Sequence, residues 1–198
     1  MRAGRLLLPC LVLCLSIGGC GPQPPQYRDP LADLSSARGV TVPENVAVQA
    51  GPTVALTFGS NVERFLKYQD DGNAYAASLG FGKKLLDQGN PQHLVDGTVE
   101  ILRRRYPRIK TVDDLASAAS QRVATTFVID IQTKAGMYPG DHTTVDLVVI
   151  AFNAEQKPTS RIAARGATQI RPYESPRIRE AHDQALTDLS GKADRLLN

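Results

Sequence analysis

The segment of residues 124–131, which reads ATTFVIDI, decides the fold, because apolar and polar side chains alternate along it. Such alternation is typical of a strand that lies with one side on a hydrophobic core. The side chains predicted to face that core are Phe127, Ile129 and Ile131. The next segment, 143–152 (TTVDLVVIAF), is apolar on both faces, so we expect a central strand there. Together with a returning strand over residues 160–170, the sequence predicts a three-stranded meander.

Upstream of the meander the sequence predicts a strand followed by two helices, and residues 109–112 are a candidate for a further brief strand. Residues 53–58 alternate again and predict a strand. Residues 60–73 are polar and are expected to be irregular, although Val62, Phe65 and Leu66 could pack a turn of helix. We expect one helix over residues 74–87 and a second that Asn90 caps, with Pro91 in its first turn. The predicted buried stripe of this second helix consists of Val95, Val99, Leu102 and Tyr106.

Two further helix signals complete the predicted domain. The residues from Thr111 to Asp114 resemble a capping box, with Asp in place of Glu, that opens a short helix. The last helix is predicted to start with Ser175 as its cap and Pro176 in its first turn. Its predicted buried stripe consists of Ile178, Ala185, Leu189 and Leu196. The sequence therefore predicts a single α+β domain over residues 53–198, with helices packed on one face of a largely antiparallel sheet of about four to five strands.

The first twenty residues read as a secretion signal. Two arginines and no acidic residue come before the apolar run of residues 6–17, and small residues lead from it to Cys20. The run from Leu15 to Cys20 resembles the bacterial lipoprotein signal, in which the cysteine is lipidated and becomes the first residue of the mature protein. The resemblance implies a signal peptide over residues 1–19, lipidation at Cys20 and, with Gly21 next, export to the outer membrane. The alternative is an ordinary secretory peptide cut nearby, which would leave a free thiol.

Charge and cysteine content exclude several classes of function. The chain carries a formal charge of +3, but two of its 23 basic residues and none of its 20 acidic ones precede Cys20, so the remainder carries +1. This balance, and the absence of tryptophan, argue against a nucleic-acid partner. Because Cys10 and Cys14 lie in the apolar run and Cys20 would carry lipid, we expect no disulfide, no thiolate zinc site and no cysteine nucleophile.

Residues 20–52 are predicted to be a lipidated, proline-rich tether. Of the 13 prolines, six fall between Gly21 and Pro52, a density that favours an extended linker. Such a linker would span roughly 30 Å or more. The alternative is an irregular segment that packs on the domain, because the valines between residues 39 and 50 alternate like those of an edge strand.

The sequence predicts no catalytic residue, no metal ligand and no cofactor site. The three histidines, His93, His142 and His182, are far apart, and none has the spacing of a metal motif such as HExxH. His182 shares a helical stripe with apolar residues, so we expect a partly buried, hydrogen-bonded side chain, with a ligand or general base as the alternative. No serine-nucleophile motif of the GxSxG or SxxK type is present.

Three other motifs have both a functional and a structural interpretation. Gly80–Lys84 (GFGKK) loosely resembles a phosphate loop but lacks the following Ser or Thr, and the glycines would equally interrupt a helix. The run Arg103–Arg105 either complements the dipole of the helix that it ends or contacts anionic envelope material, such as lipid head groups or polysaccharide. The carboxylate pairs Asp70-Asp71 and Asp113-Asp114 would suit a glycosidase, but the second pair already has a capping role.

This order of elements, behind a lipidated cysteine and a proline-rich tether, resembles the small envelope lipoproteins related to the amino-terminal domain of TolB and to the curli-secretion lipoproteins. The resemblance implies a non-catalytic binding or assembly role in the periplasm, with an envelope protein as partner. It does not extend to secretion-channel activity, because the sequence has no obvious long amphipathic hairpin. The alternatives are an auxiliary lipoprotein of an ABC-type lipid transport system and a hydrolase of envelope polymers.

Overall fold

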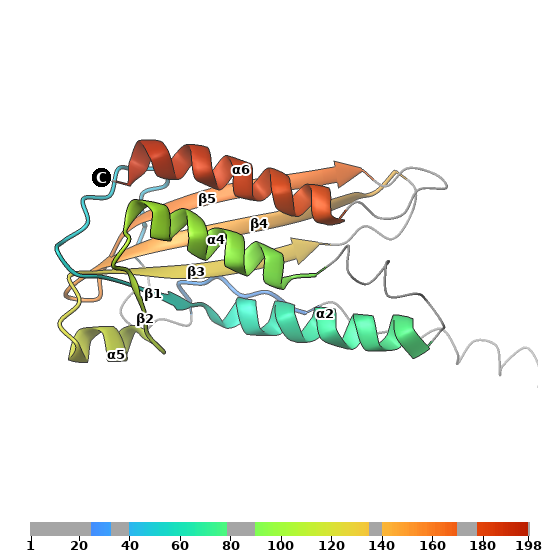
Figure 1. The fold of residues 1–198 in the computed structure, drawn as a ribbon, viewed down its shortest axis with the longest axis horizontal. Coiled ribbons are helices and arrows are strands. Elements are labelled where there is room, and N and C mark those ends of the chain that lie inside the picture. Colours follow the sequence, from blue (N-terminus) through green and yellow to red (C-terminus); the bar gives the residue numbers. More distant parts are fainter. Residues whose placement is uncertain (1–24, 33–39, 79–89, 135–139, 170–177, 198) are drawn as a thin grey trace, which may run out of the picture.

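A five-stranded sheet with the order β2-β1-β3-β4-β5 organises the molecule (Figure 1). The computed structural model describes residues 25–32, 40–78, 90–134, 140–169 and 178–197. The strands are β1 (Val54–Phe58), β2 (Lys110–Thr111), β3 (Thr125–Lys134), β4 (His142–Asn153) and β5 (Pro158–Gln169). The helices are α2 (Ser60–Ser78), α4 (Gln92–Arg105), α5 (Leu115–Ser120) and α6 (Ile178–Leu196). These elements confirm the predicted α+β class.

The sheet is mixed, with its antiparallel part formed by the predicted meander. β3 pairs antiparallel with β4, and β4 pairs antiparallel with β5. β1 instead runs parallel to both of its neighbours, β2 and β3. Parallel neighbours need a crossover, and the chain between β1 and β3 provides it through α2, α4 and α5.

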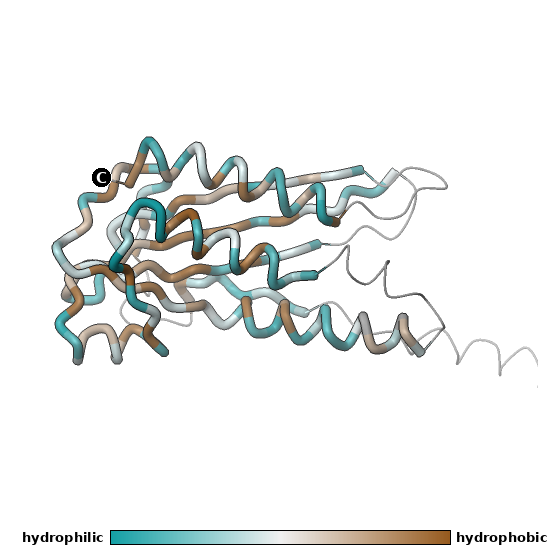
Figure 2. The backbone as a smooth tube through the Cα atoms, in the orientation of Figure 1, coloured by the Kyte–Doolittle hydropathy of each residue, from teal (hydrophilic) through white to brown (hydrophobic). Residues whose placement is uncertain are grey.

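Three helices, α2, α4 and α6, cover one face of the sheet, and Figure 1 shows them lying along its length. The main core forms between these helices and the sheet, where the brown stretches of Figure 2 run along β3, β4 and β5. The three residues predicted from the alternation of β3 all belong to this core: Phe127, Ile129 and Ile131. Of the predicted stripe of α4, Val95 and Leu102 are buried, and Val99 and Tyr106 pack against the core half-buried.

The prediction of an irregular segment over residues 60–73 is wrong, because α2 begins at Ser60 and continues to Ser78. Val62, Phe65 and Leu66 have the spacing of one helical face and pack on the core, which stabilises the helix despite its polar composition. The helix predicted over 74–87 thus starts much earlier, and its residues after Ser78 lie outside the described part of the chain.

The second face of the sheet is also covered, contrary to the expectation that helices pack on one face only. A smaller core there joins Val128, Val148 and Ile150 of the sheet to Leu115 of α5 and to Leu31 of the amino-terminal segment. This second layer explains why β3 is buried on both faces near its middle.

The described residues 25–32 and 40–52 lie against the domain. Val48 is buried, and its amide donates to the carbonyl of Leu196 at 2.6 Å. The segment also contacts the sheet, because the amide of Arg161 in β5 donates to the carbonyl of Pro43 at 3.0 Å. The sequence allowed either an extended tether or an irregular segment packed on the domain. The contacts of the described residues agree with the packed segment.

Two of the three predicted helix caps lie in the described residues, and their outcomes differ. Asn90 accepts a hydrogen bond from the amide of Gln92 at 2.9 Å, which confirms its capping role at α4. The box proposed from Thr111 to Asp114 is wrong, because Asp114 is itself the cap of α5 and accepts from the amide of Ser117 at 2.7 Å. This hydrogen bond lowers the pKa of the Asp114 carboxyl.

The carboxy-terminal helix α6 packs across β4 and β5. Within its predicted stripe, Ala185 and Leu189 are buried, whereas Ile178 and Leu196 are half-buried. The predicted cap at Ser175 lies outside the described residues. None of the helices in the described part of the chain is both long and apolar enough to cross a membrane.

Candidate binding site

A hollow of about 760 Å³ opens at the end of the domain where α4 stops, and we call it the basic pocket. One wall is the chain from Arg105 to Lys110, which leads from α4 into β2. The facing wall is the chain from Gly51 to Val54, which leads into β1. Gln121 and Val123, beyond α5, close the remaining side. Three segments that are distant in the sequence therefore build this pocket.

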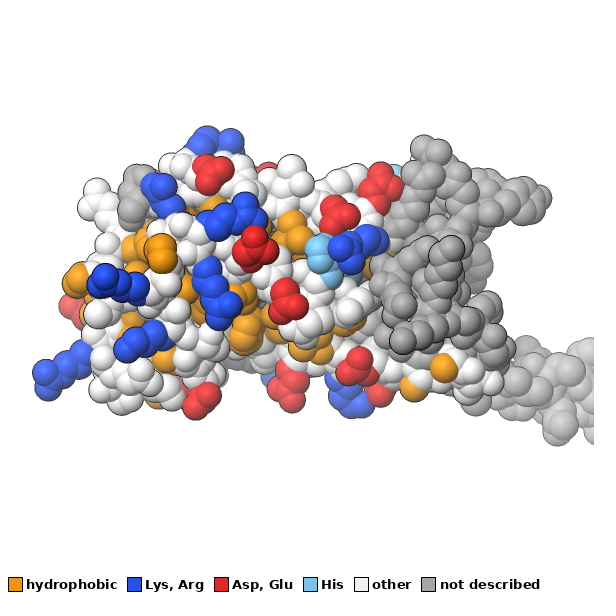
Figure 3. All heavy atoms as spheres, viewed as in Figure 1, with side chains coloured by type: hydrophobic (Ala, Val, Ile, Leu, Met, Phe, Trp, Pro, Cys, Tyr) orange, Lys and Arg blue, Asp and Glu red, His pale blue; other side chains and the backbone are white. Residues whose placement is uncertain are grey.

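The pocket has a cationic rim. Arg105, Arg108 and Lys110 line it with exposed side chains, and none of its described lining residues is acidic. Figure 3 shows lysine and arginine side chains gathered at this end of the molecule, with hydrophobic side chains between them. The rim therefore attracts an anion, and the planar donor fork of arginine suits a phosphate or carboxylate group.

The floor of the pocket is apolar. The Tyr106 ring stacks on Phe127 of the core, with ring centroids 5.4 Å apart. Burial raises the pKa of Tyr106, and nearby Arg105 opposes this effect, so the phenol stays neutral at physiological pH. Val54 and the buried Ile109 extend the apolar surface. An apolar floor beneath a cationic rim suits a ligand that joins an anionic group to an apolar one.

The arginine run that ends α4 divides among three environments. Arg105 lines the basic pocket and donates from Nε to the carbonyl of Leu197. Arg104 forms an ion pair with Glu100 one turn earlier, at 3.2 Å. Arg103 lines a different hollow, between α2 and α4. The sequence thus indicated one cation of the pocket but missed Arg108 and Lys110, since the pocket depends on where the chain turns after α4.

The three histidines do not form a common site. His93 Nε2 lies 2.8 Å from Asp183 Oδ1, across the contact between α4 and α6. His142 is exposed at the start of β4. His182 is 1% exposed and lies edge-on to Phe65, with ring centroids 6.4 Å apart. No group of three or more His, Cys, Asp or Glu side chains among the described residues could hold a metal ion.

His182 is more buried than expected, and the predicted hydrogen bond is not found. Among the described residues, neither ring nitrogen of His182 has a hydrogen-bond partner. Burial lowers its pKa to about 4, and the nearby His93 and Arg179 add to this effect while Asp183 opposes it. Protonation of His182 is therefore less favourable in the folded protein than in the unfolded chain, so the domain is most stable while this ring is neutral.

We expect acid to destabilise the protein through His182. Its pKa is about 4 in the folded protein and 6.5 for an unperturbed histidine, so the unfolded chain takes up a proton first as the pH falls. Between pH 7 and pH 4.5 this costs about 2 kcal/mol of unfolding free energy. A His182→Leu variant should lose this pH dependence. Its unfolding free energy, measured in urea, should therefore rise relative to that of the wild type by about 2 kcal/mol when the pH falls from 7 to 4.5.

Asp130 does not confound that comparison. Burial raises its pKa, so it favours the folded state as the pH falls, but it is present in both proteins and cancels in their difference. An equal pH dependence of the two proteins would show that folding does not lower the pKa of His182.

The remaining predicted motifs are scattered. Asp70 and Asp71 lie on α2, where Asp71 forms an ion pair with Lys67 at 2.9 Å. Asp114 caps α5, and so the two carboxylate pairs belong to different elements. Cys20, the predicted lipidation site, and the glycine-rich Gly80–Lys84 lie outside the described residues, and their roles stay predictions.

Comparison with known proteins identifies no family. No family model and no curated protein matches the chain. Among solved structures, a PelC variant dodecamer from Paraburkholderia phytofirmans aligns with a TM-score of 0.43 and 10% identity, over 79% of this chain and 95% of that one. A second PelC dodecamer aligns with a TM-score of 0.40 and 11% identity, over 76% and 90%. The hypothetical protein CT253 from Chlamydia trachomatis aligns with a TM-score of 0.38 and 9% identity, over 74% and 98%.

Proposed function

We propose that this chain is a lipid-anchored protein of the bacterial outer membrane that faces the periplasm and binds an anionic envelope component. In this proposal the role is non-catalytic and serves the building, maintenance or transport functions of the envelope. The observation that carries the binding role is the basic pocket, with its three cations above an apolar floor. A ligand that presents a phosphate or carboxylate beside an apolar group complements both parts of this surface.

The proposed anchor adds a geometric argument. The Tyr27 hydroxyl lies 2.9 Å from Thr133 Oγ1, near the carboxyl end of β3. Because Tyr27 is seven residues after Cys20, the lipid would be at most about 25 Å from this point. The basic pocket lies beside Val54, which pairs with Thr125 at the opposite end of β3, about 26 Å along the strand. A lipid on Cys20 would thus hold the domain close to the membrane by the end opposite to the pocket.

Binding of dodecyl phosphate tests the pocket. We expect residues 25–198 to bind it in calorimetry, and to bind dodecyltrimethylammonium at least about 10-fold more weakly, because only the phosphate can pair with the rim. The double variant Arg108→Glu/Lys110→Glu should weaken dodecyl phosphate binding by at least about 10-fold.

Arg104→Glu is the matched control for that experiment. It reverses a charge in the same basic region, but Arg104 does not line the pocket. We expect it to change the affinity by less than about 3-fold. If both variants lost affinity for dodecyl phosphate equally, binding would depend only on the overall charge of this end of the domain. If neither variant lost affinity, the basic pocket would not be the binding site.

The anchor has a separate test. We expect a Cys20→Ala variant of the full chain to remain an uncleaved precursor or to appear in the soluble fraction, because only the cysteine can carry the lipid. The wild type should sediment with the outer membrane and incorporate labelled fatty acid. A variant that is processed and fractionates like the wild type would contradict the lipoprotein interpretation.

A further inference from the structure

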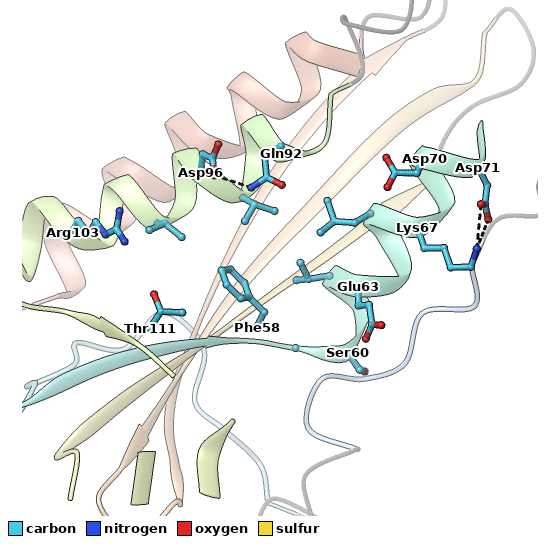
Figure 4. A pocket seen from close by; sticks show the side chains of 15 residues that line it. Phe58, Ser60, Glu63, Lys67, Asp70, Asp71, Gln92, Asp96, Arg103 and Thr111 are labelled. Atoms are coloured by element: carbon cyan, nitrogen blue, oxygen red, sulfur yellow. Dashed lines mark hydrogen bonds and ion pairs between the residues drawn. The ribbon is translucent and has the colours of Figure 1, made fainter. Parts of the chain in front are cut away.

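A second hollow, of about 830 Å³, lies between α2 and α4 and is separate from the basic pocket (Figure 4). We call it the α2–α4 groove. Its floor is apolar and includes Val62 of α2 and Val95 of α4, together with Phe58 at the end of β1. Phe58 is 39% exposed, one of the few large hydrophobic side chains in the described chain that reach the surface to this extent. Figure 4 shows the Phe58 ring between the two helices.

The groove also contains an open strand edge. The pairing of β1 with β2 covers only Ala55 and Leu56. The amide and carbonyl of successive residues alternate between the two sides of a strand. The Leu56 carbonyl accepts from Val112 beside β2, whereas the Gly59 amide donates to Ile129 of β3. The amide and carbonyl of Phe58 therefore point away from β3, toward the groove, where an extended segment could continue the line of β2.

The walls of the groove are acidic. Glu63, Asp70 and Asp71 come from α2 and Asp96 from α4, against two cations, so the lining carries a net charge of −2. One of the two cations, Lys67, forms an ion pair with Asp71. Among the described residues, neither Glu63 nor Asp70 has an ion-pair partner, and both are exposed. This sign is the opposite of that of the basic pocket, so the two hollows select different partners.

We propose that the α2–α4 groove docks an extended segment of a partner protein that carries an apolar side chain next to a lysine or arginine. The apolar side chain covers Phe58, the cation lies against the acidic side of α2 that carries Asp70 and Glu63, and the backbone of the segment pairs with the open edge of β1. The negative lining repels anionic lipid head groups, so charge complementarity favours a cationic peptide over a membrane surface. This interaction is independent of the anion site and extends the proposed function to a second surface.

A pair of labelled peptides tests the charge selection. The probes are a decapeptide of alternating Val and Lys and its counterpart with Glu in place of Lys, measured by fluorescence anisotropy with the full chain in non-ionic detergent. We expect the Lys peptide to bind at least about 10-fold more tightly than the Glu peptide. The variant Glu63→Lys/Asp70→Lys should reverse this preference, a result that misfolding cannot produce. A Phe58→Thr variant should weaken the Lys peptide by at least about 5-fold.

Glu155→Lys is the matched control, since it reverses an exposed acidic residue at the turn between β4 and β5. It should leave both affinities within about 2-fold. Equal binding of the two peptides, or a preference that Glu63→Lys/Asp70→Lys does not change, would overturn the proposal. Self-association in analytical ultracentrifugation that Asp70→Lys abolishes would also overturn it, and would assign the groove to a second copy of this chain.

Discussion

A Gly166→Ala variant is expected to lose about 3–5 kcal/mol of unfolding free energy or to fail to fold. Gly166 lies in β5 opposite Val145, directly beneath α6. A Cβ atom at this position would lie 1.8 Å from the carbonyl oxygen of Ala181 and 2.8 Å from the amide nitrogen of Ala185. Because both are backbone atoms of α6, no side-chain rotation can relieve the clash, and the helix must move away from the sheet.

Two other glycines provide matched controls for this substitution. The three atoms nearest to a Cβ on Gly97 all belong to the Leu186 side chain, the first of them at 2.6 Å, and that side chain can rotate. A Cβ on Gly191 in α6 would have only Arg195 near it, at 3.9 Å, so Gly191→Ala should stabilise the protein by about 0.5–1 kcal/mol. Urea unfolding of the three variants should rank them as Gly191→Ala, Gly97→Ala and Gly166→Ala, from most to least stable. A Gly166→Ala protein as stable as the wild type would contradict the close approach of α6 to β5.

Removal of residues 21–50 is expected to cost at least about 3 kcal/mol, because the described part of this segment belongs to the folded domain. Burial of Leu31 and Val48 accounts for about 1.5–3 kcal/mol each. The deletion also uncovers the smaller core around Val128. It exposes the outer edge of β5 as well, where Glu44 of the segment pairs with Arg161. The shortened protein should therefore unfold at lower urea concentration and aggregate more readily.

The deletion also exposes a buried carboxylate. Asp130 is fully buried, and its Oδ2 accepts from Asn61 Nδ2 at 2.8 Å. The same Asn61 amide donates to the carbonyl of Arg28 at 2.7 Å, so the segment completes this buried network. A chain that begins at Pro25 retains all of these contacts and is the control. Equal stability of the chains that begin at residues 25 and 51 would restore the interpretation of a removable tether.

Local sequence patterns predicted the strands and helices whose apolar residues recur at regular spacing on one buried face. The alternation of residues 124–131 identified β3 and its core face, and the spacing of Val95 and Leu102 identified the buried side of α4. The Asn90 cap was also predictable, since an asparagine before a proline at a helix start has a local cause. The same local reasoning failed at Ser60, because three apolar residues among polar ones form a helix only when the sheet provides a surface for them.

The candidate sites depended on contacts between distant segments. A run of arginines at residues 103–105 indicated a basic region, but the pocket needed the turn that brings Arg108 and Lys110 opposite residues 51–54. The α2–α4 groove gave no local signal, since Phe58 ends a regular alternating strand and its side chain is exposed only because it lies in the hollow between two helices. No short motif describes either site, because each is built by three or more elements.

The sequence by itself determined the α+β class, the antiparallel meander and the buried stripe of α4, because periodicity acts through neighbours a few residues apart. The tertiary structure alone decided that β1 runs parallel to β3, that residues 25–32 and 40–52 cover the domain, and that Gly166 faces the backbone of α6. These features depend on which distant surfaces meet. That outcome is set when the whole chain packs around its hydrophobic cores, and it cannot be inferred from the sequence of one strand or helix.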